Sequence, residues 1–317
     1  MPVTNTTEHF THTTEQLEAL REQLSAVLAT ATPALDAGDA QTHDDDDFLI
    51  FTTMRYDPSL AITTVPTTPN SPLLHESVVF LLDQHVRRLQ RAAQFFGFAV
   101  GKRFSSQSIL DHLSEALPPP LRDTPHRVKV LISRHGECTF ELTPLPKEHT
   151  IGLTVPDYRA IQNDQLGDVP QYLRPWTGWT IYRDTQPSTP SPFTSFKTTH
   201  RSVFNAARQR FVIIPGDKRE VLLIDGDNHA LEGTITSVAF WRKVVDPGKE
   251  GENGGDGYAW VTPHLGLGNM DGVTRTWLLE NGLIQQGVVK TSELKDGEYV
   301  LLMNGLMGIQ PAKLVLT

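Results

Sequence analysis

The chain has 317 residues, of which 38% are hydrophobic and 21% charged, and its formal net charge is −9. This size suits one large or two medium domains, and an acidic chain without a dense Lys/Arg stripe is a poor candidate for binding nucleic acid. The single cysteine, Cys138, excludes an intrachain disulfide and any CxxC motif. No stretch reaches the roughly 18 apolar residues of a membrane-spanning helix, and the polar start lacks the features of a signal or transit peptide. We expect a cytoplasmic protein that binds neither nucleic acid nor membrane.

The first 47 residues are expected to form an N-terminal extension. Apolar residues at helical spacing predict a helix over 13–31, which Pro33 ends. The run Asp44–Asp47 indicates a solvated linker, because four adjacent carboxylates cannot converge on one ion without strain.

A small α/β domain is expected over 48–165. FLIFTTMRYD predicts a strand that ends near Arg55, and 58–75 is Pro/Thr-rich and irregular. Apolar residues at helical spacing then predict a helix closed by Gly97, followed by a short helix over 105–117. RVKVLIS, at 127–133, alternates as a half-buried strand does, and CTFELTPL is its expected hairpin partner. This mixture indicates an α/β or α+β fold.

The second half is expected to hold an interdomain segment over 166–196 and a larger domain over 197–317. A helix is predicted over 197–210, followed by strands in VLLID, in the long run HALEGTITSVAFWRKVV and in YAWVTP. GKEGENGGDG, at 248–257, is expected to be a hairpin tip. A glycine-rich loop from Leu265 should lead into a helix that Gly282 ends, and two strands around Gly305 should close the domain.

Two titratable residues in this domain are candidates for chemistry. Lys197 is predicted to open a helix, where a lysine is usually solvated, but in a dry cleft desolvation would favour its neutral amine and allow a Schiff base. Glu232 interrupts an apolar strand. Such a carboxylate either faces solvent or has a buried partner, for example a protonated heterocycle.

Two further features could bind an anion. Gly266, Gly268 and Gly272 precede a predicted helix, and the N–H groups and dipole of a helix start favour negative charge. A plain loop explains this segment equally well, and its spacing does not match the GxGxxG dinucleotide fingerprint. Arg88 could bind a phosphate through two hydrogen bonds, although an arginine on a helix is more often solvated. A lysine, a buried carboxylate, an arginine and an anion-binding helix start together suit pyridoxal phosphate.

The order of these motifs resembles that of the class IV aminotransferase family, the pyridoxal-phosphate enzymes of fold type IV, from Phe48 to Leu316. The resemblance is carried by HVRRL at 85–89, Lys197, the strand from Glu232, GVTR at 272–275 and NGLM at 304–307 followed by Pro311. Ser237 stands where the family usually has asparagine. The resemblance implies a two-domain α/β (α+β) fold with the active site in the cleft between the domains, and a homodimer.

Within the family, several segments resemble segments of aminodeoxychorismate lyases and follow one another in the same order. These are FTTMR (51–55), VLISR (130–134), AFWR (239–242) and NGLM, while KTTHR and RYDP are similar to the fungal branch. RHGE, at 134–137, replaces the glycine- and arginine-rich loop of those lyases. The resemblance implies elimination of pyruvate from 4-amino-4-deoxychorismate, which forms 4-aminobenzoate for folate biosynthesis.

The resemblance also implies roles for individual residues. Lys197 would hold the cofactor as a Schiff base and take the substrate proton, while Glu232 would keep the pyridine nitrogen protonated. Thr52 or Thr53 could protonate the leaving group, and strand alternation lets only one of them face the pocket. We assign this role to Thr53. The cofactor would also be held by Arg88, Val273, Thr274 and Ser237, and the substrate by Arg55, Arg134, Arg201, Asn304 and Gly305.

Two other functions stay open. A class IV transaminase acting on D- or branched-chain amino acids, or on (R)-amines, would use the same Lys197 and Glu232, although the NGLMG corner differs from the small and hydroxyl residues usual there. A non-catalytic protein that binds pyridoxal phosphate would fit the N-terminal helix and the acidic run.

Overall fold

The computed structural model describes residues 48–60, 74–99, 104–147, 151–153, 155, 156, 158, 178–244 and 257–316. Contacts between residues divide these into two compact units, each described here by itself. The N-terminal unit comprises the described residues of His12–Lys147 and Pro190–Arg201, and the C-terminal unit those of Glu148–Thr189 and Ser202–Thr317. Lys197 therefore groups with the N-terminal unit, whereas the sequence suggested a boundary just before it; the expected domain boundaries stay predictions.

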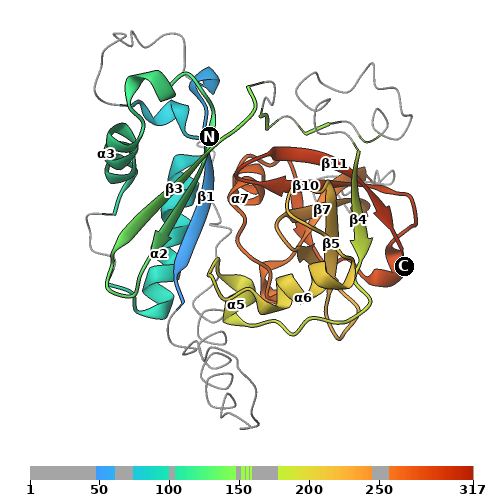
Figure 1. Cartoon of the computed structure of the whole chain (residues 1–317). Helices are drawn as coiled ribbons and strands as arrows, with labels where there is room; N and C mark the ends of the chain where they lie inside the picture. Colours follow the sequence, from blue (N-terminus) through green and yellow to red (C-terminus); the bar gives the residue numbers. More distant parts are fainter. Residues whose placement is uncertain are drawn as a thin grey trace, which may run out of the picture. The chain divides into compact units, whose positions relative to one another are not determined.

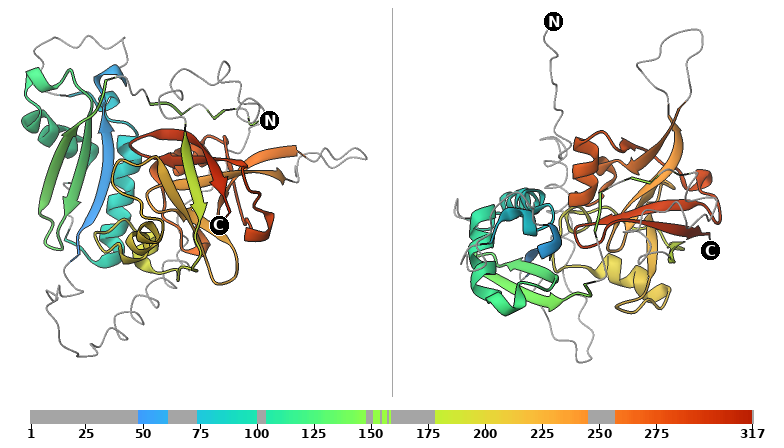
Figure 2. Two further views of the ribbon diagram at one scale, coloured as in Figure 1. Left: turned by 45° about the vertical axis from the view of Figure 1, so that its right-hand side comes forward. Right: turned by 90° about the horizontal axis from the view of Figure 1, so that it is seen from above.

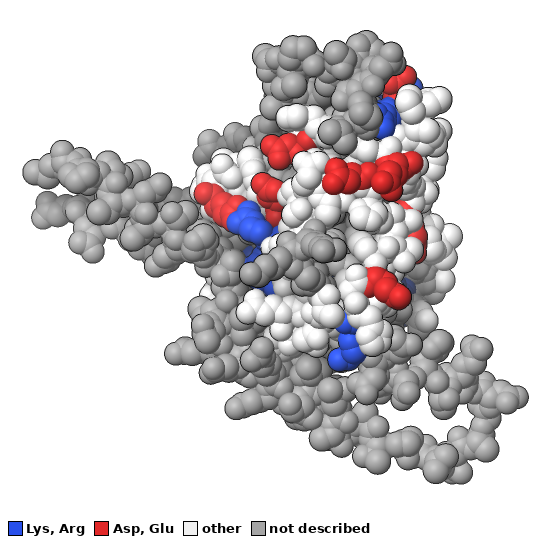
Figure 3. Space-filling view, turned by 90° about the vertical axis from the view of Figure 1, so that its left-hand side faces the viewer, with Lys and Arg blue, Asp and Glu red and all other residues white. Residues whose placement is uncertain are grey.

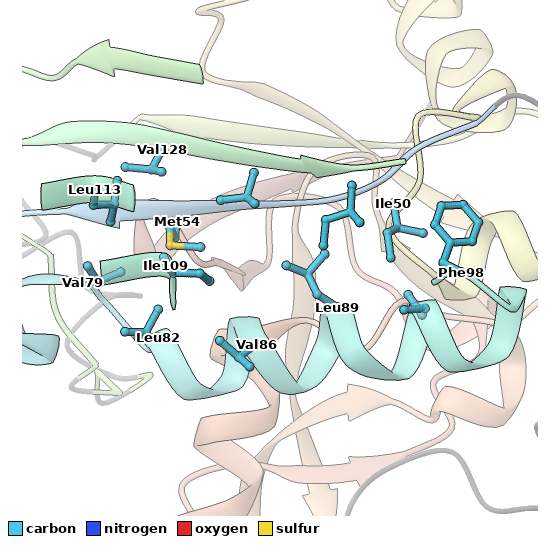
Figure 4. Packing of buried hydrophobic residues seen from close by; sticks show 14 of the residues in the cluster. Ile50, Met54, Val79, Leu82, Val86, Leu89, Phe98, Ile109, Leu113 and Val128 are labelled. Atoms are coloured by element: carbon cyan, nitrogen blue, oxygen red, sulfur yellow. The ribbon is translucent and has the colours of Figure 1, made fainter. Parts of the chain in front are cut away.

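The N-terminal unit is built on a three-stranded antiparallel sheet. The order is β1 (Ile50–Tyr56), β2 (His126–Ile132) and β3 (Cys138–Pro144), as the predicted strand and hairpin required. Helix α2 (Leu82–Phe96) lies along β1, and α3 (Ser106–Ala116) packs nearby, as Figure 1 shows. Ile50 and Met54 point from β1 toward Leu89 of α2, forming the hydrophobic core in Figure 4.

Local sequence explains where these two helices end. Gly97 adopts a left-handed conformation with φ of 68°, and its N–H donates to the carbonyl of Ala93, which closes α2 as predicted. Ser105 and Ser108 form a reciprocal capping box at the start of α3. The predicted helix over 105–117 is thereby confirmed within a residue at each end.

The C-terminal unit contains an eight-stranded mixed sheet (Figure 1). Its strand order is β6-β5-β4-β11-β10-β7-β8-β9, with parallel pairs β4–β5, β4–β11 and β8–β9. The strands are β4 (Trp179–Arg183), β5 (Arg219–Ile224), β6 (Ala230–Gly233), β7 (Ser237–Val244), β8 (Gly257–Pro263), β9 (Gln285–Gly287), β10 (Tyr299–Asn304) and β11 (Gly308–Val315). Among the described residues of this unit, the helices are α6 (Ser202–Arg210) and α7 (Val273–Glu280), while α5 (Pro192–Ser195) belongs to the N-terminal unit.

The large sheet curls around one of its own cores. Ala230 of β6 and Val261 of β8, from opposite ends of the strand order, belong to the same buried cluster as Leu302 of β10. Neighbouring residues point to the other face, where Leu301 packs with α7 and Leu223 with α6. The outer ends of β7 and β8 project from this unit in Figure 2.

Short 3₁₀ helices connect several of these elements. They are η1 (Pro58–Leu60), η2 (Glu76–Val78), η3 (Pro119–Leu121), η5 (Leu265–Leu267) and η6 (Thr291–Glu293). Across the described part of the chain, no helix combines the length and apolarity needed to cross a membrane. On the face shown in Figure 3, acidic side chains cover more of the described surface than basic ones, in keeping with the net charge of −9.

Three expectations from the sequence need correction. The predicted helix over 197–210 begins only at Ser202, because residues 197–199 instead pair with the start of β1. The long run expected as one strand is divided into β6 and β7 by a turn at 234–236. Strand β4 lies within 166–196, which was expected to be an interdomain segment. The predicted helix over 13–31, the acidic run and the tip at 248–257 lie outside the described residues.

Candidate active site

Lys197 lies in an extended segment that pairs with β1 of the same unit. The N–H of Phe51 donates to the carbonyl of Lys197 at 2.9 Å, and the N–H of Thr199 donates to the carbonyl of Leu49 at 2.8 Å. The two threonines after Lys197 are β-branched and favour this extended conformation over a helix. Nζ of Lys197 lies 4.9 Å from the centre of the Phe51 ring, and the side chain is half-buried.

Two phenylalanines fix the segment that carries Lys197. Phe196, directly before it, stacks on Phe95 of α2 with ring centroids 4.5 Å apart. Phe193 lies parallel to Phe96 at 5.9 Å. Since both anchors are buried in the core of the N-terminal unit, the backbone of Lys197 is held firmly between this core and β1.

Arg88 of α2 meets a threonine and a histidine in the same unit. Its Nη2 lies 2.5 Å from Oγ1 of Thr52, and that oxygen lies 2.6 Å from Nδ1 of His85. All three side chains are buried. Burial and the nearby charges of Arg88 and Lys197 hold the pKa of His85 well below its usual value. His85 is therefore neutral at physiological pH, and the charge of Lys197 acts at this cluster.

The structure separates the two threonines considered for the leaving group. Thr52 shares the face of β1 that carries Ile50 and Met54 into the core, and it is fully buried beside Arg88. Thr53 points to the opposite face and is partly exposed. The catalytic role of Thr53 stays a prediction. The contacts of Thr52 indicate a different role, which is to position Arg88.

The three arginines suggested for substrate binding lie in different surroundings. Arg55 is fully buried, and its guanidinium lies 2.7 Å from the carboxylate of Asp57. Arg134 is exposed, with its guanidinium 5.5 Å from the Phe98 ring centre. Arg201 is half-buried at the end of the Lys197 segment. Their roles toward a substrate carboxylate stay predictions.

Glu232, in the C-terminal unit, is buried on β6. Its side chain is 6% exposed, and Oε1 accepts a hydrogen bond from the N–H of Met270 at 3.0 Å. The carboxylate lines a narrow, partly open cavity. The other lining residues are Leu231, Ser237, Val238, Thr262, Pro263, Asn269, Met270 and Arg275. Of the two alternatives that the sequence left open for Glu232, a solvent-facing or a buried carboxylate, the structure shows the buried one.

Arg275 is a buried cation on the wall of that cavity. Nε lies 3.1 Å from the hydroxyl of Thr262, and Nη2 lies 2.8 Å from the carbonyl of Pro263 and 2.7 Å from Oε1 of Gln286. Burial lowers the pKa of Arg275 to about 10, against the opposing effect of the carboxylates of Asp271 and Glu232. Arg275 therefore carries a charge that interacts with Glu232.

Glu220, also in the C-terminal unit, orders the turn between β6 and β7. Its fully buried carboxylate accepts hydrogen bonds from the backbone N–H groups of Thr234 and Ile235 and from the hydroxyls of Thr234 and Thr236. Nη1 of Arg208 lies 3.8 Å from Oε1 of Glu220. Because Glu232 precedes this turn and Ser237 follows it, Glu220 fixes the backbone between two predicted cofactor-binding residues.

The start of α7 lies against Ser237 and Asn304. Gly272, the N-cap residue, supplies no side-chain cap, and a Cβ there would collide with Oγ of Ser237. The hydroxyl of Thr274 donates to the carbonyl of Asn304 at 2.8 Å. That hydroxyl is thus engaged, and the N–H groups of Val273 and Thr274 are better candidates for holding a phosphate.

Asn304 closes the corner between β10 and β11. Its Oδ1 accepts from the N–H groups of Leu306 and Met307, both at 2.9 Å, and its Nδ2 lies 3.3 Å from the carbonyl of Ile235. Gly305 is buried within the corner. Asn304 thus has a structural role that the sequence did not indicate, and its contact with substrate stays a prediction.

Three polar residues around these groups were not predicted from the sequence. His85 and Arg275 stood inside quoted motifs, as the first residue of HVRRL and the last of GVTR. Glu220 could have been suspected, because a carboxylate beside the apolar run VLLI is costly to bury unless several donors satisfy it.

Comparison with known proteins agrees with these motifs. The model of the family described as amino-transferase class IV matches residues 50–315, and the chain belongs to this family. Aminodeoxychorismate lyase of Saccharomyces cerevisiae is 29% identical over 255 residues, which cover 72% of this chain and 66% of the yeast protein. A Schizosaccharomyces pombe protein named as a candidate aminodeoxychorismate lyase is 29% identical over 253 residues, covering 76% of this chain and 89% of that one.

The fold is also shared with solved structures of aminotransferases. A hypothetical aminotransferase from Mycobacterium tuberculosis, in its PLP-bound form, has a TM-score of 0.53 and 16% identity, covering 88% of this chain and 87% of that one. The expected mixed fold of fold-type IV enzymes is thereby confirmed, and the chain belongs to a family of enzymes that use pyridoxal phosphate.

Proposed function

We propose that the protein is a 4-amino-4-deoxychorismate lyase that depends on pyridoxal phosphate. The observation that carries this proposal is the similarity to the Saccharomyces lyase across 255 residues. Membership of the amino-transferase class IV family supports the cofactor, and the buried position of Glu232 supports its role beside the cofactor ring. The reaction converts the substrate into 4-aminobenzoate and pyruvate.

The donor set of the chain fits this cofactor. Lys197 offers an amine for the aldehyde, and Glu232 offers a buried carboxylate for the ring nitrogen. Arg88, held by Thr52, offers a cation for the phosphate, and the N–H groups at the start of α7 offer neutral donors. When bound, pyridoxal phosphate supplies an electron sink for the carbon that loses its proton.

The chain itself would move two protons in the reaction. Nζ of Lys197 takes the proton from the carbon that bears the amine, and the carbon–oxygen bond to the enolpyruvyl group then breaks. Thr53 donates a proton to the departing enolpyruvyl oxygen, and the enol becomes pyruvate. Positioned acid–base groups of this kind contribute typically about 10²–10⁴-fold to a rate.

The substrate carries two carboxylates, which require cations or backbone donors. We propose Arg55, Arg134 and Arg201 for these contacts, together with Asn304 and Gly305 at the corner of β10 and β11. The pairing of Arg55 with Asp57 would keep this guanidinium fixed in orientation. We also propose that the protein works as a homodimer in the cytoplasm.

A class IV transaminase is the second candidate, because the family is named for that activity. It would use Lys197 and Glu232 in the same places but would return the proton to the cofactor. Incubation with amino acids and with (R)-amines, in the absence of 4-amino-4-deoxychorismate, separates the two. A lyase should release no stoichiometric keto acid or ketone, whereas one equivalent per active site would favour a transaminase.

Covalent labelling tests whether the protein uses the cofactor at all. After incubation with pyridoxal phosphate, borohydride reduction should fix the cofactor to Lys197, as peptide mapping would show. A protein that binds pyridoxal phosphate without catalysis would also be labelled but would convert neither substrate nor amino donor. Failure to label Lys197 would remove the basis of the proposed function.

A further inference from the structure

We propose that Arg275 is a positioning residue that keeps the buried carboxylate of Glu232 ionised. The proposal rests on the role proposed above for Glu232 as partner of the cofactor's ring nitrogen. An ionised carboxylate is costly to bury without a countercharge. Arg275 lines the same narrow cavity as Glu232, in the same compact unit, and can provide that charge.

The guanidinium of Arg275 is held in a fixed orientation. Thr262 and the carbonyl of Pro263, at the end of β8, and Gln286, on β9, accept from Nε and Nη2. None of these three acceptors carries a formal charge. The arginine therefore retains its positive charge for the carboxylates nearby, and its attachment to two strands prevents it from turning away.

One end of the guanidinium, the Nη1 group, takes no part in these three hydrogen bonds. Among the described residues, Nη1 of Arg275 is buried and has no hydrogen-bond partner, and the same holds for Oδ1 of Asn269. Both residues line the cavity beside Glu232. This buried donor and this buried acceptor therefore share the cavity wall with the carboxylate of Glu232.

Two other titratable groups lie around Arg275. Asp271 interacts with its charge more strongly than Glu232 does, and it accepts a hydrogen bond from the hydroxyl of Thr276. His264 lies before η5, and its pKa is lowered by burial and by the charge of Arg275. A rival explanation is therefore that Arg275 only balances Asp271 and ties α7 to the sheet.

Double-mutant cycles on the protein without cofactor distinguish these explanations. Urea unfolding at pH 7.5 should be measured for Arg275→Met, Glu232→Gln, Asp271→Asn and the two double variants. We expect Arg275→Met to raise the unfolding equilibrium constant at least about tenfold more in the presence of Glu232 than in the Glu232→Gln background. Coupling to Asp271 is compatible with this result. Absence of coupling to Glu232, whatever the coupling to Asp271, would overturn the proposal.

The affinity for pyridoxal phosphate provides a second readout, which a purely structural arginine would not move. Loss of a nearby opposite charge shifts an ionisation by about one to three pH units. The acid limb of cofactor binding is the pH range in which the affinity for pyridoxal phosphate falls as the pH is lowered. In Arg275→Met this limb should therefore lie at a pH higher by that amount than in wild type. In the Glu232→Gln background, Arg275→Met should not shift it. Arg275→Lys, which retains the charge, should restore most of the acid limb and also serves if Arg275→Met does not fold.

The failure of this proposal differs from failure of the proposed function. Wild-type protein that bound no pyridoxal phosphate would contradict the proposed function, while the unfolding cycles would still decide whether Arg275 and Glu232 are coupled. An unshifted acid limb with intact turnover would contradict the role of Arg275 alone.

Discussion

Oγ1 of Thr52 lies 2.6 Å from Nδ1 of His85 in the interior of the N-terminal unit. The same oxygen accepts a hydrogen bond from Nη2 of Arg88. A guanidinium has only donors, so the hydroxyl proton of Thr52 is free to point toward His85. The hydroxyl of Thr52 can then donate to Nδ1 of the neutral imidazole. Helix α2 and strand β1 thus orient Arg88 through a defined chain of hydrogen bonds.

This assignment predicts a pH dependence of stability. His85 has a lowered pKa in the folded protein, mainly because it is buried, so the unfolded chain binds a proton more readily. Its contribution to stability is complete above the unfolded value of about 6.5 and is lost as the pH falls toward the folded value. The free energy of unfolding should fall by up to about 1.4 kcal/mol per pH unit through this group.

The test compares wild type with His85→Asn, which keeps an acceptor near the position of Nδ1 but does not titrate. Urea unfolding of the cofactor-free proteins between pH 5 and 8.5 should show a shallower acid decline for the variant. Their slopes should coincide between pH 7.5 and 8.5. Parallel curves throughout the acid range would contradict the burial of a neutral His85.

The hydroxyl of Thr52 should be necessary for holding Arg88. Thr52→Val keeps the shape but leaves two buried polar partners unsatisfied, and we expect a loss of about 1–3 kcal/mol in the free energy of unfolding. Thr52→Ser should recover most of it. Thr53→Val is a matched control on the opposite face of the same strand. If both valine variants lost equal stability, the hydrogen bonds of Thr52 would not explain the effect.

Glu220 should stabilise the turn between β6 and β7. Glu220→Gln replaces an acceptor oxygen by a donor amide among groups that themselves donate, and should lower the free energy of unfolding by about 1–3 kcal/mol. The control is Glu141→Gln, because Glu141 is half-exposed and lies 3.1 Å from Lys129; such pairs contribute about 0–1 kcal/mol. Equal losses of unfolding free energy in the two variants, measured by chemical denaturation, would contradict a role of Glu220 in stabilising the turn.

The close approach of Gly272 to Ser237 allows a rescue experiment. Gly272→Ala should destabilise the protein by about 1–3 kcal/mol, because the new Cβ collides with Oγ of Ser237. Adding Ser237→Ala removes that oxygen and should restore much of the thermal stability. Gly257→Ala, where the Cβ would meet open space, is the control. A double variant no more stable than Gly272→Ala would show that the collision is not the cause.

Periodic segments could be predicted from the sequence, and residues governed by distant contacts could not. Helix α2 was found because its apolar stripe is long and Gly97 ends it. The predicted start of a helix at Lys197 was wrong because hydrogen bonds to Leu49 and Phe51, about 150 positions away, hold that segment extended. Strand β4 was missed because the five residues Trp179–Arg183 are too few to show a clear period.

For the candidate site too, some features could be predicted from the sequence and others could not. The apolar neighbours of Glu232 marked it as unusual without deciding whether it is buried, and the family motifs located Lys197 and Arg88. The contacts that orient them did not follow, since Thr52 lies 36 positions from Arg88 and Met270 lies 38 from Glu232. Such partners are determined by the packing of the sheet and helices.

The most direct test of the proposed lyase is the product balance from 4-amino-4-deoxychorismate. Wild-type protein loaded with pyridoxal phosphate should release one 4-aminobenzoate and one pyruvate for each substrate consumed, measured together by fluorescence and a coupled assay. Lys197→Ala should lose at least about 10²-fold in rate, the lower range for a general base. Absence of both products from wild type, or full activity in Lys197→Ala, would contradict the account.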